Sequence, residues 1–158
     1  MPRTLTAAMV ALVTGMNATA GDRTYDPFLH YDRAMNVLLV WGGTSMAAGV
    51  PMVLNDDPWV KRIGTQNILW GGINAGIGVA AKALNRRNRV SMGRNDRINS
   101  FRRSMVINGL LDAGYIGTGI ALAVLAKNER LKATGVGFII QGSFLLGFDW
   151  ANYGLTFR

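Results

Sequence analysis

The stretch ATGVGFIIQGSFLLGFDWANYGLTF, residues 133–157, contains a single charged side chain, Asp149. An α-helix rises about 1.5 Å per residue, so roughly 20 apolar residues cross the hydrocarbon core of a membrane, which is about 30 Å thick. A helix of this length on the surface of a soluble protein carries a polar face, which these residues lack. The stretch therefore predicts a membrane-spanning helix.

Three other stretches have the same character. Residues 34–55 and 63–81 contain no charge, and residues 104–126 contain only Asp112. Only 16% of the 158 residues are charged, against roughly 25% in typical soluble domains. The sequence therefore predicts an all-α membrane protein with four transmembrane helices.

The beginning of the chain has a different pattern. Arg3 precedes a short apolar run, which ends at Ala18-Thr19-Ala20. A positive start, a short apolar core and a small-x-small end are typical of a secretory signal peptide. Residues 1–20 are therefore predicted to be a signal peptide, with a retained N-terminal hydrophobic helix as the alternative.

The remaining chain divides into four parts. Residues 21–33 are polar and aromatic, and we expect them to lie along the membrane surface. The predicted first transmembrane hairpin covers residues 34–84, a basic loop covers residues 85–104, and the second hairpin with the C-terminal tail covers residues 105–158. The two hairpins are distantly alike, because a shift of 71 residues pairs Gly64 with Gly135. An ancient duplication would explain such pairs, although they barely exceed chance.

The net charge of +8 is concentrated in the predicted loop, which carries seven arginines. Anionic lipid headgroups or an acidic protein partner explain such a cluster between two membrane spans better than nucleic acid does. The positive-inside rule places the loop in the cytoplasm, whereas a cleaved signal peptide places it outside. We favour the second orientation, because the signal acts first. The proposed contact residues are Arg86, Arg87, Arg89, Arg94, Arg97, Arg102 and Arg103.

Small residues four positions apart permit close approach of helices in a membrane. One such row lies in the third predicted span and a second row lies in the second. These rows predict tight helix packing without specifying the partner. Their residues are Gly109, Ala113, Gly117 and Ala121, together with Gly72 and Gly76.

Asp112 is the residue most suggestive of function, because a carboxylate inside a span is costly and is usually buried against a partner. Asn108, Asp112 and Tyr115 lie on one helix face. In the antiparallel fourth span, Asp149 is expected near the level of Asn108, and Gln141 deeper. These five residues form a predicted intramembrane polar cluster. It is either a proton or cation site or, as we favour, a polar clasp in which Asp149 pairs near the surface with Arg102 or Arg103.

Catalysis and cofactor binding find no support in the residue types. The chain contains no cysteine, and its only histidine, His30, has no second ligand near it in the sequence, so we expect His30 to be a surface residue. No nucleophile, metal-binding set or acid–base pair is recognisable. We therefore expect no enzymatic activity, no catalytic residues, no metal and no cofactor.

The segments INGLLDAGY (residues 107–115) and IQGSFLLGFD (residues 140–149) resemble the signature of an uncharacterised family of small bacterial four-span membrane proteins with an N-terminal signal peptide. The resemblance implies a multi-pass protein of the bacterial inner (cytoplasmic) membrane. It transfers no activity.

Two functions follow as hypotheses. The first is a non-catalytic accessory or assembly subunit that packs against other membrane-protein subunits in a larger complex of respiratory or photosynthetic type. The second is a small transporter or channel, acting as a homo-oligomer, with Asp112 and Gln141 forming an intramembrane polar path.

Overall fold

The computed structural model describes residues 25–158, and all regular secondary structure in that range is helical. The prediction of an all-α protein is therefore confirmed. The signal-peptide prediction concerns residues 1–20, which lie outside the described range. The four helices are α2 (Pro27–Val53), α3 (Pro58–Ser91), α4 (Arg94–Leu125) and α5 (Glu129–Leu155).

Local sequence signals explain where the helices begin. Asp26 caps α2 by accepting hydrogen bonds from the backbone N–H groups of Phe28 and Leu29. Asp57 caps α3 in the same way, and Asn128 caps α5. Both aspartate caps are followed by a proline, whose fixed φ angle and missing N–H suit the first position of a helix.

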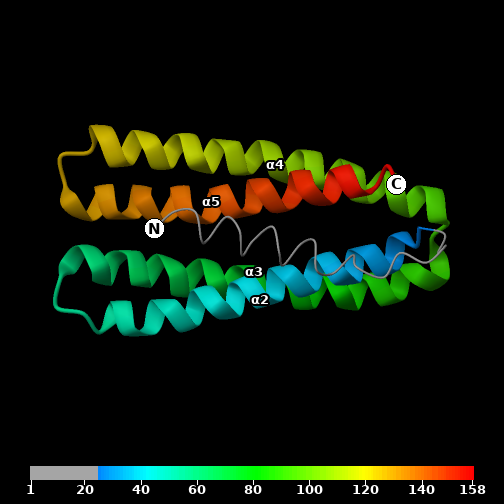
Figure 1. Ribbon diagram of the computed structural model, residues 1–158, viewed down its shortest axis with the longest axis horizontal. Coiled ribbons are helices and arrows are strands. Elements are labelled where there is room, and N and C mark those ends of the chain that lie inside the picture. The colour runs from blue at the N-terminus through cyan, green and yellow to red at the C-terminus, as the bar shows by residue number, and fades with distance from the viewer. Residues whose placement is uncertain (1–24) are drawn as a thin grey trace.

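The helices form two antiparallel hairpins, α2–α3 and α4–α5, that lie side by side (Figure 1). Both hairpin turns, residues 54–57 and 126–128, lie at the same end of the bundle, which we call the turn end. The α3–α4 connection and the C-terminus lie at the opposite end. We call this the basic end, because the seven arginines between residues 85 and 104 surround it.

Glycines at seven-residue spacing bring the helices of each hairpin into backbone contact. A Cβ atom on Gly49 would lie 2.7 Å from the carbonyl oxygen of Gly64, and one on Gly119 would lie 2.7 Å from that of Gly135. Seven residues earlier on α2, Gly42 meets Gly71 in the same way. A seven-residue repeat keeps one seam of each helix facing its partner.

The same contacts recur in both hairpins. Gly49 and Gly64 of the first hairpin correspond to Gly119 and Gly135 of the second, an offset of 70 residues on the first helix and 71 on the second. The predicted shift of 71 therefore describes the second helix of each hairpin. An origin by duplication stays a prediction.

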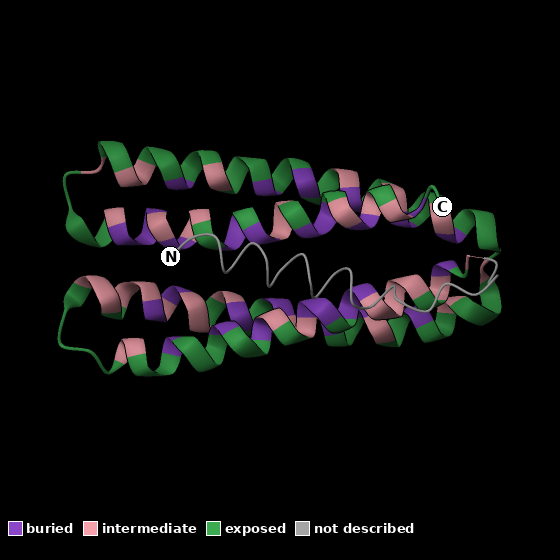
Figure 2. Cartoon of the chain, in the orientation of Figure 1, coloured by how far each residue is buried: buried purple, intermediate pink, exposed green. Residues whose placement is uncertain are grey.

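The distribution of polarity differs from that in a soluble protein, although a buried apolar cluster that includes Leu38, Phe101 and Phe148 is present. Large apolar side chains such as Ile77, Val79 and Leu110 are exposed, and green exposed surface covers the outward sides of the helices (Figure 2). Many buried side chains are polar. They are Ser45, Gln66, Asn74, Asn85, Arg97, Asp112, Thr134, Gln141, Asp149, Asn152 and Thr156.

The predicted basic loop at residues 85–104 is wrong. α3 continues to Ser91 and α4 begins at Arg94, so only Met92 and Gly93 connect them. Arginine is a good helix former and no proline interrupts the segment, so both helices continue past the apolar stretches. A helix of 34 residues, such as α3, is about 50 Å long and exceeds the hydrocarbon core of about 30 Å. Likewise, α2 already begins at Pro27, within the predicted surface segment 21–33.

Three of the four described helices, α2, α4 and α5, are long and apolar enough to cross a membrane. The prediction of four such helices is therefore only partly confirmed, because α3 does not meet this criterion. Its sequence includes several polar side chains that face the interior of the bundle, among them Gln66, Asn74 and Asn85. These residues lower the average hydropathy of α3, although its exposed residues between positions 63 and 81 are all apolar or glycine. Its two ends, by contrast, carry exposed charges such as Lys61 and Arg86.

Candidate functional site

A pair of buried carboxyl groups joins α4 to α5. Asp112 of α4 and Asp149 of α5 lie on the facing sides of the two helices, where their carboxyl groups interact. Their exposed fractions are 5% and 4%. Oδ2 of Asp112 is buried without a hydrogen-bond partner. The two helices approach closely here, because a Cβ atom on Gly142 would lie 2.9 Å from the side chain of Ile116.

Both aspartates lie on the rows of close packing described above. Asp112 precedes Gly119 by seven residues on α4, and Asp149 follows Gly142 by seven residues on α5. The equivalent positions of the first hairpin hold glycines, Gly42 and Gly78. The second hairpin therefore places two acidic side chains where the first has none.

The structure assembles the predicted polar cluster only in part. Asp112 and Asp149 meet directly, whereas Asn108 is exposed and belongs to no contact of the pair. Tyr115 instead packs edge-on against Trp70 and Phe138, with ring centroids 5.2 Å and 6.0 Å away. Asn108 is offset from Asp112 by only about 40° around α4, and the next residue, Gly109, is the one that packs against α5 at this level.

Asp149 also does not form the predicted pair with Arg102 or Arg103. The Nε of Arg102 donates to the Thr156 hydroxyl at 2.7 Å, and one of its terminal nitrogens donates to the Thr156 carbonyl at 2.8 Å. The guanidinium also lies over the Phe157 ring, 3.8 Å from its centroid. Arg103 is exposed.

Gln141 lies between the two hairpins and not beside Asp112. Its side-chain oxygen accepts from the indole N–H of Trp41 at 2.9 Å, and its amide donates to Oδ1 of Asn67 at 3.1 Å. The Trp41 ring stacks on Phe144, with centroids 3.8 Å apart and an angle of 3°. Trp41 was not among the predicted site residues. The available signal was its position inside an uncharged span, away from the membrane interface where tryptophan is usually found.

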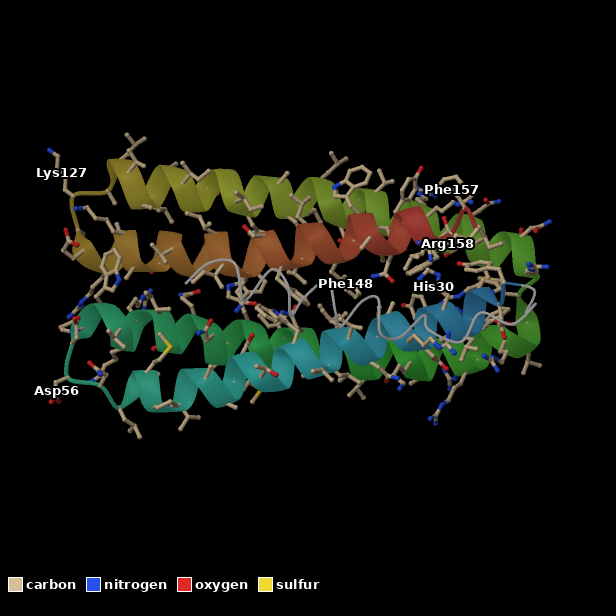
Figure 3. The ribbon with its side chains drawn as sticks, viewed as in Figure 1. His30, Asp56, Lys127, Phe148, Phe157 and Arg158 are labelled. Atoms are coloured by element: carbon tan, nitrogen blue, oxygen red, sulfur yellow. The ribbon has the colours of Figure 1, made fainter. Side chains whose placement is uncertain are left out.

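A hydrogen-bonded chain at the basic end also connects the hairpins. The Tyr25 hydroxyl lies 2.7 Å from Nδ1 of His30, whose Nε2 lies 3.1 Å from Oδ1 of Asn152. The Asn152 amide donates to the Phe148 carbonyl at 2.8 Å. His30, expected to be a surface residue, is therefore a half-buried contact between α2 and α5 near the C-terminus (Figure 3).

Because the Asn152 amide already donates to Phe148, its Oδ1 is the acceptor for His30, which fixes the proton on Nε2. Nδ1 is then free to accept from Tyr25. Burial lowers the pKa of His30 from its ordinary value of 6.5 and raises the pKa of the Tyr25 hydroxyl. Both directions favour the neutral forms that this chain of hydrogen bonds requires.

We expect the protein to lose stability as the pH falls below about 6.5. The unfolded chain then binds a proton at His30 that the folded chain resists, because protonation of Nδ1 removes the acceptor for Tyr25. Unfolding in detergent, followed by circular dichroism between pH 7.5 and 5, measures the effect. In the variant His30→Gln, the loss of stability between pH 7.5 and 5 that is due to His30 should disappear. If the variant loses stability with falling pH as the wild type does, His30 is not the group responsible.

The seven arginines fall into two groups. Arg97 is buried, and its guanidinium lies 3.8 Å from the centroid of the Tyr31 ring. Arg102 is bonded to Thr156 as described. Arg97 is therefore enclosed within the bundle and is not available to lipid headgroups or a partner, whereas for the half-buried Arg102 such a contact stays a prediction. The exposed members are Arg86, Arg87, Arg89, Arg94 and Arg103.

The predicted rows of small residues mostly face outward. Gly109 is buried, and a Cβ atom there would lie 3.3 Å from the indole nitrogen of Trp150. The close contacts within the chain follow the seven-residue rows instead, and the other five residues make none of them. Packing of these residues against another protein stays a prediction. They are Gly72, Gly76, Ala113, Gly117 and Ala121, all exposed.

Within residues 25–158, no group of three or more histidine, cysteine, aspartate or glutamate side chains is arranged to hold a metal ion. The polar side chains that the structure brings together are aspartates, amides, an indole and an imidazole. The chemistry available to them is hydrogen bonding and proton exchange.

The fold and these contacts define a class of protein: an α-helical bundle of the membrane type, with apolar side chains outside, polar side chains inside and three helices able to cross a membrane. The chain belongs to the family of unknown function DUF6992, whose model matches residues 37–150. The predicted membership of an uncharacterised family is confirmed. No curated protein and no solved structure matches the chain.

Proposed function

We propose that this protein is a non-catalytic integral membrane protein with four spans, which serves as an accessory or assembly subunit among other membrane proteins. The observation that carries the proposal is its outer surface, where apolar side chains and open glycines face outward while polar side chains are buried. Such a surface suits lipid and the helices of neighbouring proteins. The resemblance described above favours the bacterial inner membrane as its location.

The outer face of α3 supports a fourth span. Leu69, Ile73, Ile77 and Val79 are exposed on α3, whereas its amide side chains face the other helices. α3 also packs along α2 through three glycines, Gly64, Gly71 and Gly78. We expect a helix held in this way against a spanning helix to cross the membrane with it, because its amide side chains are buried within the bundle and away from lipid.

Open glycines on the outside favour a protein partner over lipid alone. Positions Gly72, Gly76, Gly114 and Gly117 have no atom within 4 Å of where a Cβ would lie. Glycine weakens a helix relative to alanine by about 1 kcal/mol, so glycines without a contact in the chain are costly. Close approach of a helix from another subunit would offset that cost.

Gly117→Leu tests this proposal. Its side chain would project from the outside of the bundle, so we expect the isolated chain to fold while its complex with other subunits is lost. The measurement is the native mass of the tagged protein, extracted from its host in mild detergent, with co-purifying bands identified by mass spectrometry. Leu110→Phe, an exposed change from one large apolar side chain to another, is the control. A wild-type protein that migrates as a lone monomer would contradict the proposal.

A small oligomeric transporter or channel is the second candidate, favoured by the buried pair Asp112–Asp149. Gln141 has no part in a path beside Asp112, because it is bonded to Trp41 and Asn67. The five exposed arginines at the basic end support attraction to anionic lipid headgroups in either case.

A further inference from the structure

We propose that Asp112 and Asp149 bind a single proton between them and so act as a buried acid–carboxylate pair within the α4–α5 hairpin. This goes beyond the role as an assembly subunit and does not depend on it. The ligand is a proton, which one carboxyl group carries as O–H and donates to the other.

The first argument is the contact itself. An ionised carboxylate has only acceptor oxygens, whereas a protonated carboxyl group has one donor. The side chains of Asp112 and Asp149 are both buried and interact with each other across the α4–α5 seam. A hydrogen bond between two carboxyl groups contains a proton, so a pair held together in this way carries one negative charge instead of two.

The second argument is the environment, because no residue between positions 25 and 158 forms an ion pair with either carboxyl group in place of that proton. The nearest charge acting on Asp149 is Asp112 itself. Within α4, Arg102 is bonded to Thr156. From α3, Lys82 donates to Asn36 at the exposed edge of α2. From α2, His30 contacts Asn152, which lies about one helical turn beyond Asp149. His30 contributes no positive charge there, because its hydrogen bonds require the neutral imidazole.

The third argument is the unpartnered oxygen. Asp112 is 95% buried, since its exposed fraction is 5%, and its Oδ2 receives no hydrogen bond from any described residue. Two ionised carboxylates this close would repel each other with nothing to neutralise them. Retaining one proton removes that repulsion, so proton binding holds α4 and α5 together. Release of the proton would change the charge of the pair from −1 to −2.

The seven-residue rows explain why the pair meets at all. Asp112 and Asp149 continue the rows of Gly119 and of Gly135 and Gly142, where the helix backbones approach most closely. A short side chain at such a position points directly at the facing helix. The acidic pair is therefore held by the rigid hairpin and not by flexible side chains.

Infrared spectroscopy of the purified full-length protein tests the proposal. At neutral pH we expect the C=O stretching band of a protonated carboxyl group, shifted to lower frequency in D₂O. Labelling aspartate with ¹³C at the side-chain carboxyl should shift the band further, which assigns it to aspartate without any substitution. The double variant Asp112→Asn/Asp149→Asn should lose the band. Asp56→Asn, which alters an exposed turn, should keep it.

Three results would overturn the proposal. One is a wild-type spectrum without a protonated carboxyl band at neutral pH, a measurement that does not depend on whether the variants fold. Another is a band that stays at full strength in the double variant. The third is a band that disappears when NaCl replaces KCl in the buffer, because the pair would then bind a sodium ion in place of the proton.

Discussion

Replacing Gly119 with alanine should destabilise the α4–α5 hairpin by about 1–3 kcal/mol, whereas the same change at Gly117 should not. A Cβ atom on Gly119 would lie 2.7 Å from the carbonyl oxygen of Gly135 and 3.0 Å from the backbone N–H nitrogen of Ile139. Both atoms belong to the backbone of α5, so relief of the overlap requires the helices to separate. At Gly117 nothing lies within 4 Å of the added atom.

The two glycines form a matched pair, because they lie two residues apart on one helix. Alanine is a better helix former than glycine by about 1 kcal/mol, and this gain applies equally at both positions. The measurement is the free energy of unfolding in mixed detergent micelles, followed by circular dichroism as the denaturing detergent increases. Equal unfolding curves for the two variants would contradict the packing of α4 on α5 through Gly119.

Gln141→Leu should weaken the contact between the two hairpins by about 1–3 kcal/mol. Gln141 is 2% exposed, and its two hydrogen bonds connect three helices, because Trp41 belongs to α2 and Asn67 to α3. Leucine has a similar volume but leaves the indole N–H and the Asn67 oxygen buried without partners. Hydrogen bonds between membrane helices average about 0.6 kcal/mol in double-mutant cycles, which places the expected loss toward the lower end of the range.

Asn108→Leu is the control for this variant. It makes the same change from amide to leucine, but at an exposed position, so it should leave stability within about 0.5 kcal/mol of the wild type. A cycle that combines Gln141→Leu with Asn67→Leu should show a coupling energy, because the two amides are in contact. Additive effects would indicate that the hydrogen bond between them contributes nothing.

For the candidate site, individual residues could be predicted from the sequence, but the contacts between them could not. Asp112 and Asp149 stand out because charges are rare in these stretches, and that rarity can be read from the sequence alone. Their direct contact could not be deduced, because helical spacings of four and three residues group Asp112 with Asn108 and Tyr115 instead. The glycines seven residues apart, Gly135 and Gly142 on α5, were a usable signal, because the same spacing continues to Asp149.

The rows of small residues also show that the sequence does not reveal which face of a helix is buried. Gly117 and Gly119 are equally plausible packing residues in the sequence, yet one is open and the other meets the backbone of α5. Two positions differ by about 200° around a helix, so the identity of the residue does not reveal which side faces a neighbour. His30 and Arg97 were likewise expected at the surface and are enclosed by aromatic and amide side chains from other helices.

The sequence by itself determined the helical class, the long apolar stretches and the capped turns, because each depends on neighbouring residues and on the local density of charge. Only the tertiary structure decided which face of each helix is buried. It also decided that residues 85–104 continue two helices, that Gln141 joins the hairpins and that Asp112 meets Asp149. These features depend on the rotation and register of one helix against another, which are set by backbone contacts between residues far apart in the chain.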